Sequence, residues 1–273
     1  MKMKILSGLL ALCAGANAAA GPFAPAAGVT GTTAIAKNDT RINAWASGYL
    51  NYVPGTGSLD AAFKTPEKAL GPAVGDSFDV VSLGNGGKIT LTFSGTLFNG
   101  AGWDFAVFEN SFSNTFLELA FVEVSSDGRH FFRFPNFSFT PSALSAFGTI
   151  DPTNIDGYGG KYRQGFGTPF DLDVFKNVSG IDVNRISHIR LVDVVGDGRE
   201  FDNYPPSLNG PHPIFDPFPT TGSVGFDLEA LAARHFNAAV VAPVPLPAAL
   251  WLFGIAAPLL AARRRHLPFT HTL

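Results

Sequence analysis

Cysteine is almost absent from this chain of 273 residues, because Cys13 is its only cysteine. That residue lies in a segment that reads as a cleavable export signal, so we expect the mature protein to have neither disulfides nor thiol chemistry. Leu12 precedes the cysteine, whereas a lipoprotein signal requires a small residue there. The stability of the mature protein must therefore come from its packed core.

Charge and catalytic motifs are also scarce. Asp, Glu, Lys and Arg together make up 15% of the chain. There is no phosphate-binding loop between a strand and a helix, no HExxH helix, no nucleophile elbow and no Cys/His metal cluster. The six histidines are isolated in sequence, which favours surface or packed positions. We therefore expect a protein that is not an enzyme.

The N-terminus has the three parts of a secretory signal. Lysines at positions 2 and 4 form a basic region, and residues 5–14 form an apolar run. An Ala-x-Ala cleavage site follows at residues 16–18 or 18–20. The pattern predicts a signal peptide over residues 1–20, which signal peptidase would remove during export.

The C-terminus combines a proline motif, an uncharged apolar run over residues 248–262 and an arginine triplet. The motif consists of Val244, Pro245, Leu246, Pro247 and Ala248, and the triplet of Arg263, Arg264 and Arg265. The prolines disfavour a helix before the apolar run. Fifteen helical residues rise about 22 Å, and the extended motif brings the segment closer to the roughly 30 Å of a bilayer core. Arginines stay on the cytoplasmic side. The segment therefore predicts a single transmembrane helix; a buried helix of a soluble domain would need a polar face, which is missing.

These three parts, in this order over residues 243–265, resemble the VPLPA variant of the PEP-CTERM sorting signal. That family occurs in Gram-negative bacteria that make exopolysaccharide. The resemblance implies processing at the proline motif by an exosortase, a membrane-embedded enzyme similar to cysteine transpeptidases. It also implies a location at the cell surface or in the extracellular matrix, with the protein anchored to the membrane at least transiently. Residues 266–273 form a short tail.

The exported body, residues 21–242, is acidic. It contains 14 Lys and Arg against 22 Asp and Glu, which makes its net charge −8. This charge argues against binding to nucleic acid or to anionic lipid. No internal repeat or low-complexity linker divides the segment, so we expect one domain.

Short segments of alternating or apolar residues, bounded by turn residues, predict an all-β body. We expect hairpins pairing residues 78–83 with 88–93 and residues 117–125 with 129–134. Further strands are expected at residues 104–110, 186–195 and 225–232. Residues 169–176 read as a short helix with Thr168 as its N-cap. The pattern predicts an antiparallel β-sandwich with long loops.

Several segments of the body resemble the discoidin-like, galactose-binding-like jelly rolls of bacterial surface proteins. The similarity lies in residues 69–71, 81–91, 102–109 and 122–128, and residues 225–230 look like the closing strand of such a domain. The resemblance implies a jelly-roll-like sandwich. It also implies a module that binds glycans or other cell-surface ligands, or that has no known ligand.

Aspartate outnumbers glutamate by 16 to 6, which suits either calcium sites or turns. If the strand ending near Asp193 and the strand starting at Asp227 are antiparallel neighbours, these carboxylates meet at one end of the sandwich. The candidate calcium ligands are Asp104, Glu109, Asp193, Asp216 and Asp227. The alternative is that the aspartates cap turns.

Aromatic side chains in Gly- and Pro-rich loops are candidates for stacking on sugar rings. They are Tyr158, Tyr162, Phe166, Tyr204 and Phe218. The alternative is that they plug the open ends of the core. The leading hypothesis is a binding module for polysaccharide or another envelope component. A structural matrix protein without a discrete ligand and an enzyme acting on exopolysaccharide are the alternatives.

Overall fold

The computed structural model of the chain describes residues 20–239. The predicted sorting signal with its transmembrane helix, and residues 1–19 of the predicted signal peptide, lie outside the described residues. Within the described range, no helix is long and apolar enough to cross a membrane.

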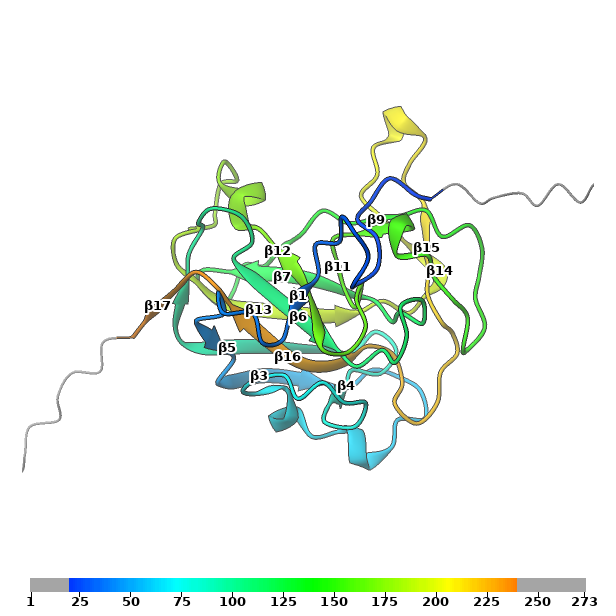
Figure 1. Ribbon diagram of the computed structural model, residues 1–273, viewed down its shortest axis with the longest axis horizontal. Helices are drawn as coiled ribbons and strands as arrows, with labels where there is room; N and C mark the ends of the chain where they lie inside the picture. Colours follow the sequence, from blue (N-terminus) through cyan, green and yellow to red (C-terminus); the bar gives the residue numbers. More distant parts are fainter. Residues whose placement is uncertain (1–19, 240–273) are drawn as a thin grey trace, which may run out of the picture. The chain divides into compact units, whose positions relative to one another are not determined.

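The described chain is mostly β, and two antiparallel sheets form its centre (Figure 1). The first sheet has the order β1-β12-β6-β16-β2, and β4 also pairs with β16. Its strands are β1 (Ile35–Ala36), β2 (Ala44–Trp45), β4 (Val81–Ser82), β6 (Phe105–Glu109), β12 (Phe166–Phe170) and β16 (Asp227–Ala233). The prediction of an all-β body is confirmed.

The second sheet has the order β11-β7-β13-β5-β17, with β3 added beside β5 and β8 beside β7. Its strands are β3 (Gly48–Val53), β5 (Lys88–Leu97), β7 (Ala120–Ser125), β8 (Phe132–Arg133), β11 (Tyr158–Gly159), β13 (Ile186–Asp193) and β17 (Phe236–Ala238). Two small ribbons pair β9 (Phe137–Ser138) with β10 (Ile155–Asp156) and β14 (Asp197–Phe201) with β15 (Pro213–Phe215).

Helical structure in the described range is limited to short 3-10 segments. They are η1 (Ala61–Phe63), η2 (Pro66–Ala69), η3 (Pro152–Asn154), η4 (Leu172–Phe175) and η5 (Pro206–Leu208). Since none exceeds four residues, they act as corners between strands and leave the core to the sheets.

The main core lies where the two sheets contact each other. Ile89, Leu91 and Phe93 of β5 are buried, as their alternation predicts, and they pack with β6 and β16 residues of the other sheet. Strands β6, β7 and β16 are buried along their whole length. Alternate residues of β6 enter two clusters: Phe105 and Val107 join the main core, whereas Phe108 packs in a second cluster. Cover on both faces explains why these strands are mostly apolar in sequence, with only a few acidic residues in each.

The two expected hairpins have different outcomes. Strands β7 and β8 pair as predicted, with Glu123 opposite Arg133. The pairing of residues 78–83 with 88–93 was wrong, because β4 pairs with β16 in the first sheet while β5 belongs to the second. The glycine-rich turn between β4 and β5 therefore carries the chain from one sheet to the other.

The helix expected at residues 169–176 is shorter and begins later. Residues up to Phe170 continue strand β12, and η4 starts only at Leu172. Asp171 caps it, because its side chain accepts a hydrogen bond from the backbone N–H of Asp173 at 2.9 Å. Thr168 lies within the strand, so its predicted role as N-cap was wrong.

Candidate ligand-binding site

Loops from five separate parts of the chain converge on one cavity of about 210 Å³. Its lining comprises Phe63 from η1, Ser77 and Phe78, Asn110 to Glu118 in the loop between β6 and β7, Ala146 and Phe147, and the segment from Thr220 to Asp227 that leads into β16. The full set is Phe63, Ser77, Phe78, Asn110, Phe112, Phe116, Glu118, Ala146, Phe147, Thr220, Thr221, Ser223 and Asp227. The β6, β7 and β16 ends hold these loops in place.

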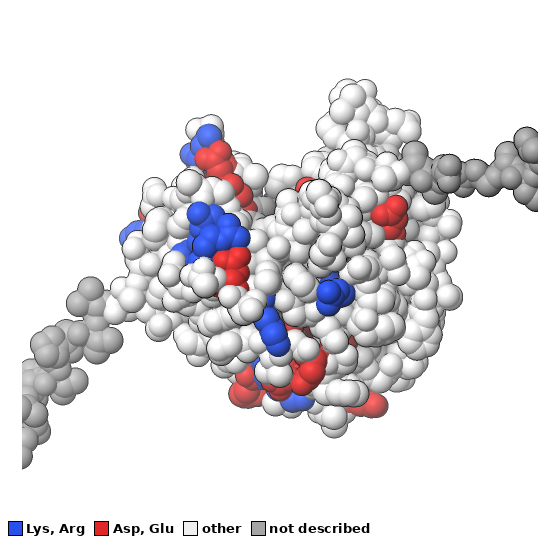
Figure 2. Space-filling view, in the orientation of Figure 1, with Lys and Arg blue, Asp and Glu red and all other residues white. Residues whose placement is uncertain are grey.

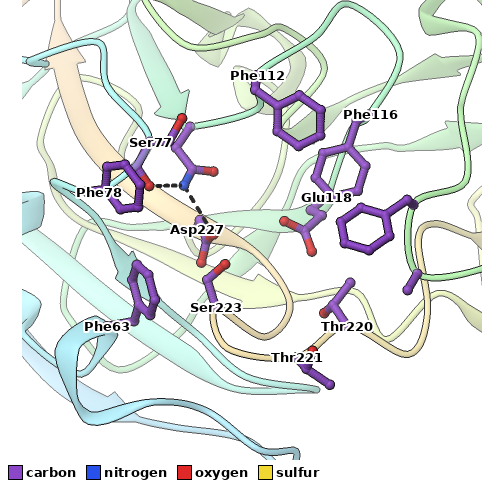
Figure 3. Close-up of a pocket in the computed structure, with 13 residues that line it drawn as sticks. Phe63, Ser77, Phe78, Phe112, Phe116, Glu118, Thr220, Thr221, Ser223 and Asp227 are labelled. Carbon is purple, nitrogen blue, oxygen red and sulfur yellow. Dashed lines mark hydrogen bonds between the residues drawn. The ribbon is translucent and has the colours of Figure 1, made fainter.

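Phenylalanine forms the rim. The three most exposed large apolar side chains among the described residues are Phe147, Phe78 and Phe112, at 79%, 74% and 61% exposure, and all three border this cavity. Phe112 stacks on Phe116, with ring centroids 4.7 Å apart. In Figure 3, Phe63 and Phe78 stand on one side of the cavity and Phe112 and Phe116 on the other. Exposed aromatic rings gathered around a hollow mark a surface suited to contact another molecule.

The floor of the cavity is polar, and hydrogen bonds connect its residues. Asp227 opens β16, and its carboxylate accepts a hydrogen bond from Ser82 Oγ in β4. Its other oxygen accepts from Asn110 Nδ2 at 3.2 Å, and the same amide donates to the carbonyl of Ser77 at 2.9 Å (Figure 3). This network joins two strands of the first sheet to the loop that carries Phe78.

Glu118 is the second carboxylate of the floor. Its side chain is 3% exposed, and its Oε1 atom has no hydrogen-bond partner. Figure 3 shows its carboxyl group directed into the cavity between the two groups of rings. A buried polar atom without a partner is costly, so a ligand that donates a hydrogen bond to this carboxyl group would be favoured.

The acidic residues are concentrated inside the protein. Few charged side chains appear over much of the face drawn in Figure 2, whereas nine of the 22 acidic residues are buried. The buried ones are Asp104, Glu109, Glu118, Glu123, Asp193, Asp202, Asp216, Asp227 and Glu229. The net charge of the body thus describes its interior more than its surface.

Burial and mutual repulsion raise the pKa values of the cavity acids. Desolvation, reinforced by Asp227 and Glu109, raises the pKa of Glu118 well above its usual value. Desolvation raises the pKa of Asp227 to about 6, although hydrogen bonds from Ser82, Ser223 and Asn110 act in the opposite direction. The floor therefore carries two carboxyl groups whose pKa values burial holds above their ordinary values.

The five candidate calcium ligands do not all meet. Asp104 precedes β6 and Glu109 ends it, so about 16 Å of extended chain separates them. One ion cannot contact both, which removes Asp104 from a common site. Asp104 instead binds the backbone N–H groups of Gly100 and Leu172, at 2.8 and 2.6 Å, and lies 2.5 Å from His235 Nδ1.

The other four candidates lie toward the cavity end, where electrostatic coupling links them to Glu118. The strands carrying Asp193 and Asp227 belong to different sheets, so the antiparallel pairing on which their meeting was made to depend does not occur. The carboxylates approach across the sandwich instead, because Asp193 bonds the N–H of Phe226. Asp216 accepts from the N–H of Leu119 at 3.0 Å.

Most of these carboxylates serve backbone N–H groups, and residues 20–239 contain no group of three or more Asp, Glu, His or Cys side chains arranged to hold a metal ion. Calcium binding stays a prediction. The turn alternative accounts for much of the aspartate excess, because eight aspartates accept a hydrogen bond from the N–H two residues ahead. They are Asp39, Asp76, Asp127, Asp151, Asp171, Asp182, Asp197 and Asp202.

None of the five aromatic residues expected to bind sugar lines the cavity. Tyr158 and Tyr162 are 0% and 1% exposed, so they plug the core and leave no face for a ligand. The Arg163 guanidinium lies 4.6 Å from the ring centre of Phe166 and covers it. Tyr204 packs against Phe137, Phe139 and His212, and Phe218 is half-buried.

The sequence contained one signal for the observed site. Phe112 and Phe116 stand alone among serine, asparagine and threonine in residues 111–116, where an apolar ring has no local partner. Glu118 lies in the predicted strand 117–125, whereas the structure starts β7 at Ala120 and leaves Glu118 in the loop before it. No sequence pattern indicated that Phe78 and Phe147 would lie together, and the fold brings both to the cavity.

Comparison of the chain with protein-family models, with curated protein sequences and with solved structures finds no match.

Proposed function

We propose that this chain is an exported envelope protein whose jelly-roll-like body binds polysaccharide through the phenylalanine-rimmed cavity, without catalysing a reaction. One observation carries the proposal: the three most exposed large apolar side chains of residues 20–239 surround one cavity with carboxyl, amide and hydroxyl groups at its floor. Sugar rings have apolar faces and polar edges, so rings at the rim and hydrogen-bonding groups below suit them.

The export signals in the sequence support the proposed location of the body outside the cytoplasm. The N-terminal signal, the proline motif at residues 244–248 and the arginine triplet support release of the body toward the outside, with exosortase processing at its C-terminal end. Intact-mass analysis of envelope material should show that both termini are lost. Recovery of the unprocessed chain from the cytoplasm would contradict this part of the proposal.

Binding is tested with the purified full-length protein and a panel of oligosaccharides of acidic, neutral and basic type, by calorimetry. Phe147→Ala and Phe112→Ala remove exposed rings at little cost to the core, so we expect them to weaken binding by about tenfold or more. Phe201→Ala is the matched control, because Phe201 is 55% exposed and does not line the cavity. Absence of binding to every oligosaccharide would favour the structural matrix role.

Hydrolysis of polysaccharide is the second candidate, and a specific observation favours it. Two carboxyl groups with raised pKa values, Glu118 and Asp227, line the same cavity. Glycosidases use such a pair as acid and base or nucleophile. Release of reducing ends from an oligosaccharide by the intact protein, abolished in Glu118→Gln, would replace the binding function by an enzymatic one.

A further inference from the structure

The lining of the cavity is one-sided in charge. It contains two acidic residues, Glu118 and Asp227, and none of its thirteen residues is Lys, Arg or His. Lys68 donates to the carbonyl of Phe78 at 2.6 Å but does not line the cavity. A sugar that carries a carboxylate would therefore meet repulsion here, with no cation to offset it.

Glu118 is the lining residue on which the excess of negative charge acts most directly. Four other acids act on it electrostatically, namely Asp227, Glu109, Asp216 and Asp193. Its carboxyl group is directed into the cavity and Oε1 has no hydrogen-bond partner, so a donor from the ligand is the group that would satisfy this carboxyl. A positively charged donor should bind Glu118 more tightly than a neutral one. A charge-assisted hydrogen bond in a partly desolvated site is stronger than a neutral hydrogen bond.

The rim is suited to the same kind of ligand. Phe112 and Phe116 stack, and the ring centres of Phe116 and Phe147 are 5.9 Å apart. Phenylalanine has no hydroxyl or indole N–H, so its ring offers only its apolar, electron-rich face. Such faces attract ammonium groups through their quadrupole and also cover the apolar face of a sugar.

We infer that the ligand of this cavity is an amino sugar with a free amine, whose ammonium group binds Glu118 below the phenylalanine rim. The inference rests on the proposed glycan-binding function and narrows it to a basic saccharide. An acetylated amine of the same sugar is neutral and larger, so it leaves the carboxylates unbalanced.

The test compares two tetrasaccharides with one backbone, β-1,4-linked glucosamine and β-1,4-linked N-acetylglucosamine, by calorimetry on the full-length protein at pH 7. We expect the free amine form to bind about tenfold more tightly. Glu118→Gln should remove this preference while neutral binding remains. Phe147→Ala should weaken both ligands.

Glu229→Gln is the matched control. Glu229 is also buried and also has an unpartnered carboxylate oxygen, but it does not line the cavity. If the general negative charge of the protein attracted the amine, both glutamine variants would lose affinity equally, and the inference would be overturned. Equal affinity for the two tetrasaccharides would overturn it too, while leaving glycan binding intact. No binding of either form, nor of acidic or neutral oligosaccharides, would instead remove the proposed function itself.

Discussion

Asp193 Oδ1 accepts a hydrogen bond from the backbone N–H of Phe226 at 2.6 Å. Asp193 ends β13 in the second sheet, and Phe226 immediately precedes β16 in the first. The other oxygen, Oδ2, accepts from the N–H of Gly86 at 2.8 Å, in the connection between β4 and β5. A single buried carboxylate therefore ties both sheets together at the end of the sandwich that carries the cavity.

Asp193→Ala should destabilise the protein, because it leaves the N–H groups of Gly86 and Phe226 without acceptors. We expect a loss of about 3 kcal/mol in the free energy of unfolding, measured by urea titration, and a smaller loss for Asp193→Asn, which keeps one acceptor. Asp182→Ala is the control, since Asp182 is exposed and bonds only a nearby turn, and it should cost less than about 1 kcal/mol. Equal losses at the two positions would contradict the bridging role.

Gly225→Ala tests the close approach of the same carboxylate. Gly225 has φ of +67°, and a Cβ there would lie 2.4 Å from Asp193 Oδ1. We expect a loss of about 3 kcal/mol. Gly71 provides the control, because its φ is +87° and a Cβ would meet nothing within 4 Å. Gly71→Ala should therefore cost only the backbone strain, about 1 kcal/mol, so the difference between the two melting temperatures measures the contact.

Asp227 should make stability fall as the pH rises. Its pKa is raised in the folded protein from 3.8 to about 6 by burial, so the unfolded chain loses its proton first. Between pH 4 and pH 6 unfolding releases a proton, and the folded state loses on the order of 3 kcal/mol relative to the unfolded chain. Above pH 6 both states are ionised and this loss stays constant.

Urea unfolding of Asp227→Asn across the same pH range isolates this effect, since the amide does not titrate. The variant should show a smaller decrease in stability between pH 4 and pH 6 than the original protein. Superimposable pH profiles would mean that Asp227 has an ordinary pKa in the folded protein.

Calcium binding by the remaining cluster of Glu109, Asp193, Asp216 and Asp227 is tested by thermal melting in calcium, magnesium and chelator at matched ionic strength. A bound ion raises the melting temperature by mass action, and general screening would act equally with magnesium. The prediction requires a calcium-specific rise that disappears in Asp227→Asn. The same melting temperature in calcium and in chelator would leave these carboxylates to their hydrogen-bonding roles.

Local signals predicted the fold well where partners are close in sequence. The β7–β8 hairpin follows from the turn Ser126-Asp127-Gly128, in which Asp127 bonds the N–H groups of Arg129 and His130. The β4–β5 connection contains an equally clear turn, but β4 pairs instead with β16, about 145 residues away. Turn chemistry determines where a strand ends, and it leaves open which strand lies beside it.

The candidate site also combines features that the local sequence predicts with features that depend on distant parts of the chain. The sequence left open whether aromatic residues in Gly- and Pro-rich loops contact a ligand or pack in the core, and Tyr158 and Tyr162 are buried. Phe147, which is 79% exposed, was not among the candidates. Exposure of a ring depends on what the rest of the chain places over it. Glu118 likewise became a candidate only when the fold left one of its oxygens buried and unpartnered.

The sequence by itself determined that the body is mostly β, as residues 20–239 show, and that residues 21–242 contain no cysteine and carry a net charge of −8. These properties depend on composition or on contacts within a few residues. Only the tertiary structure decided that Asp104 lies apart from Glu109, that Asp193 crosses to Phe226, and that phenylalanines from three loops and a 3-10 turn surround two carboxyl groups. The reason is physical: burial, desolvation and strand pairing arise between segments far apart in the chain, and they appear only when those segments pack together.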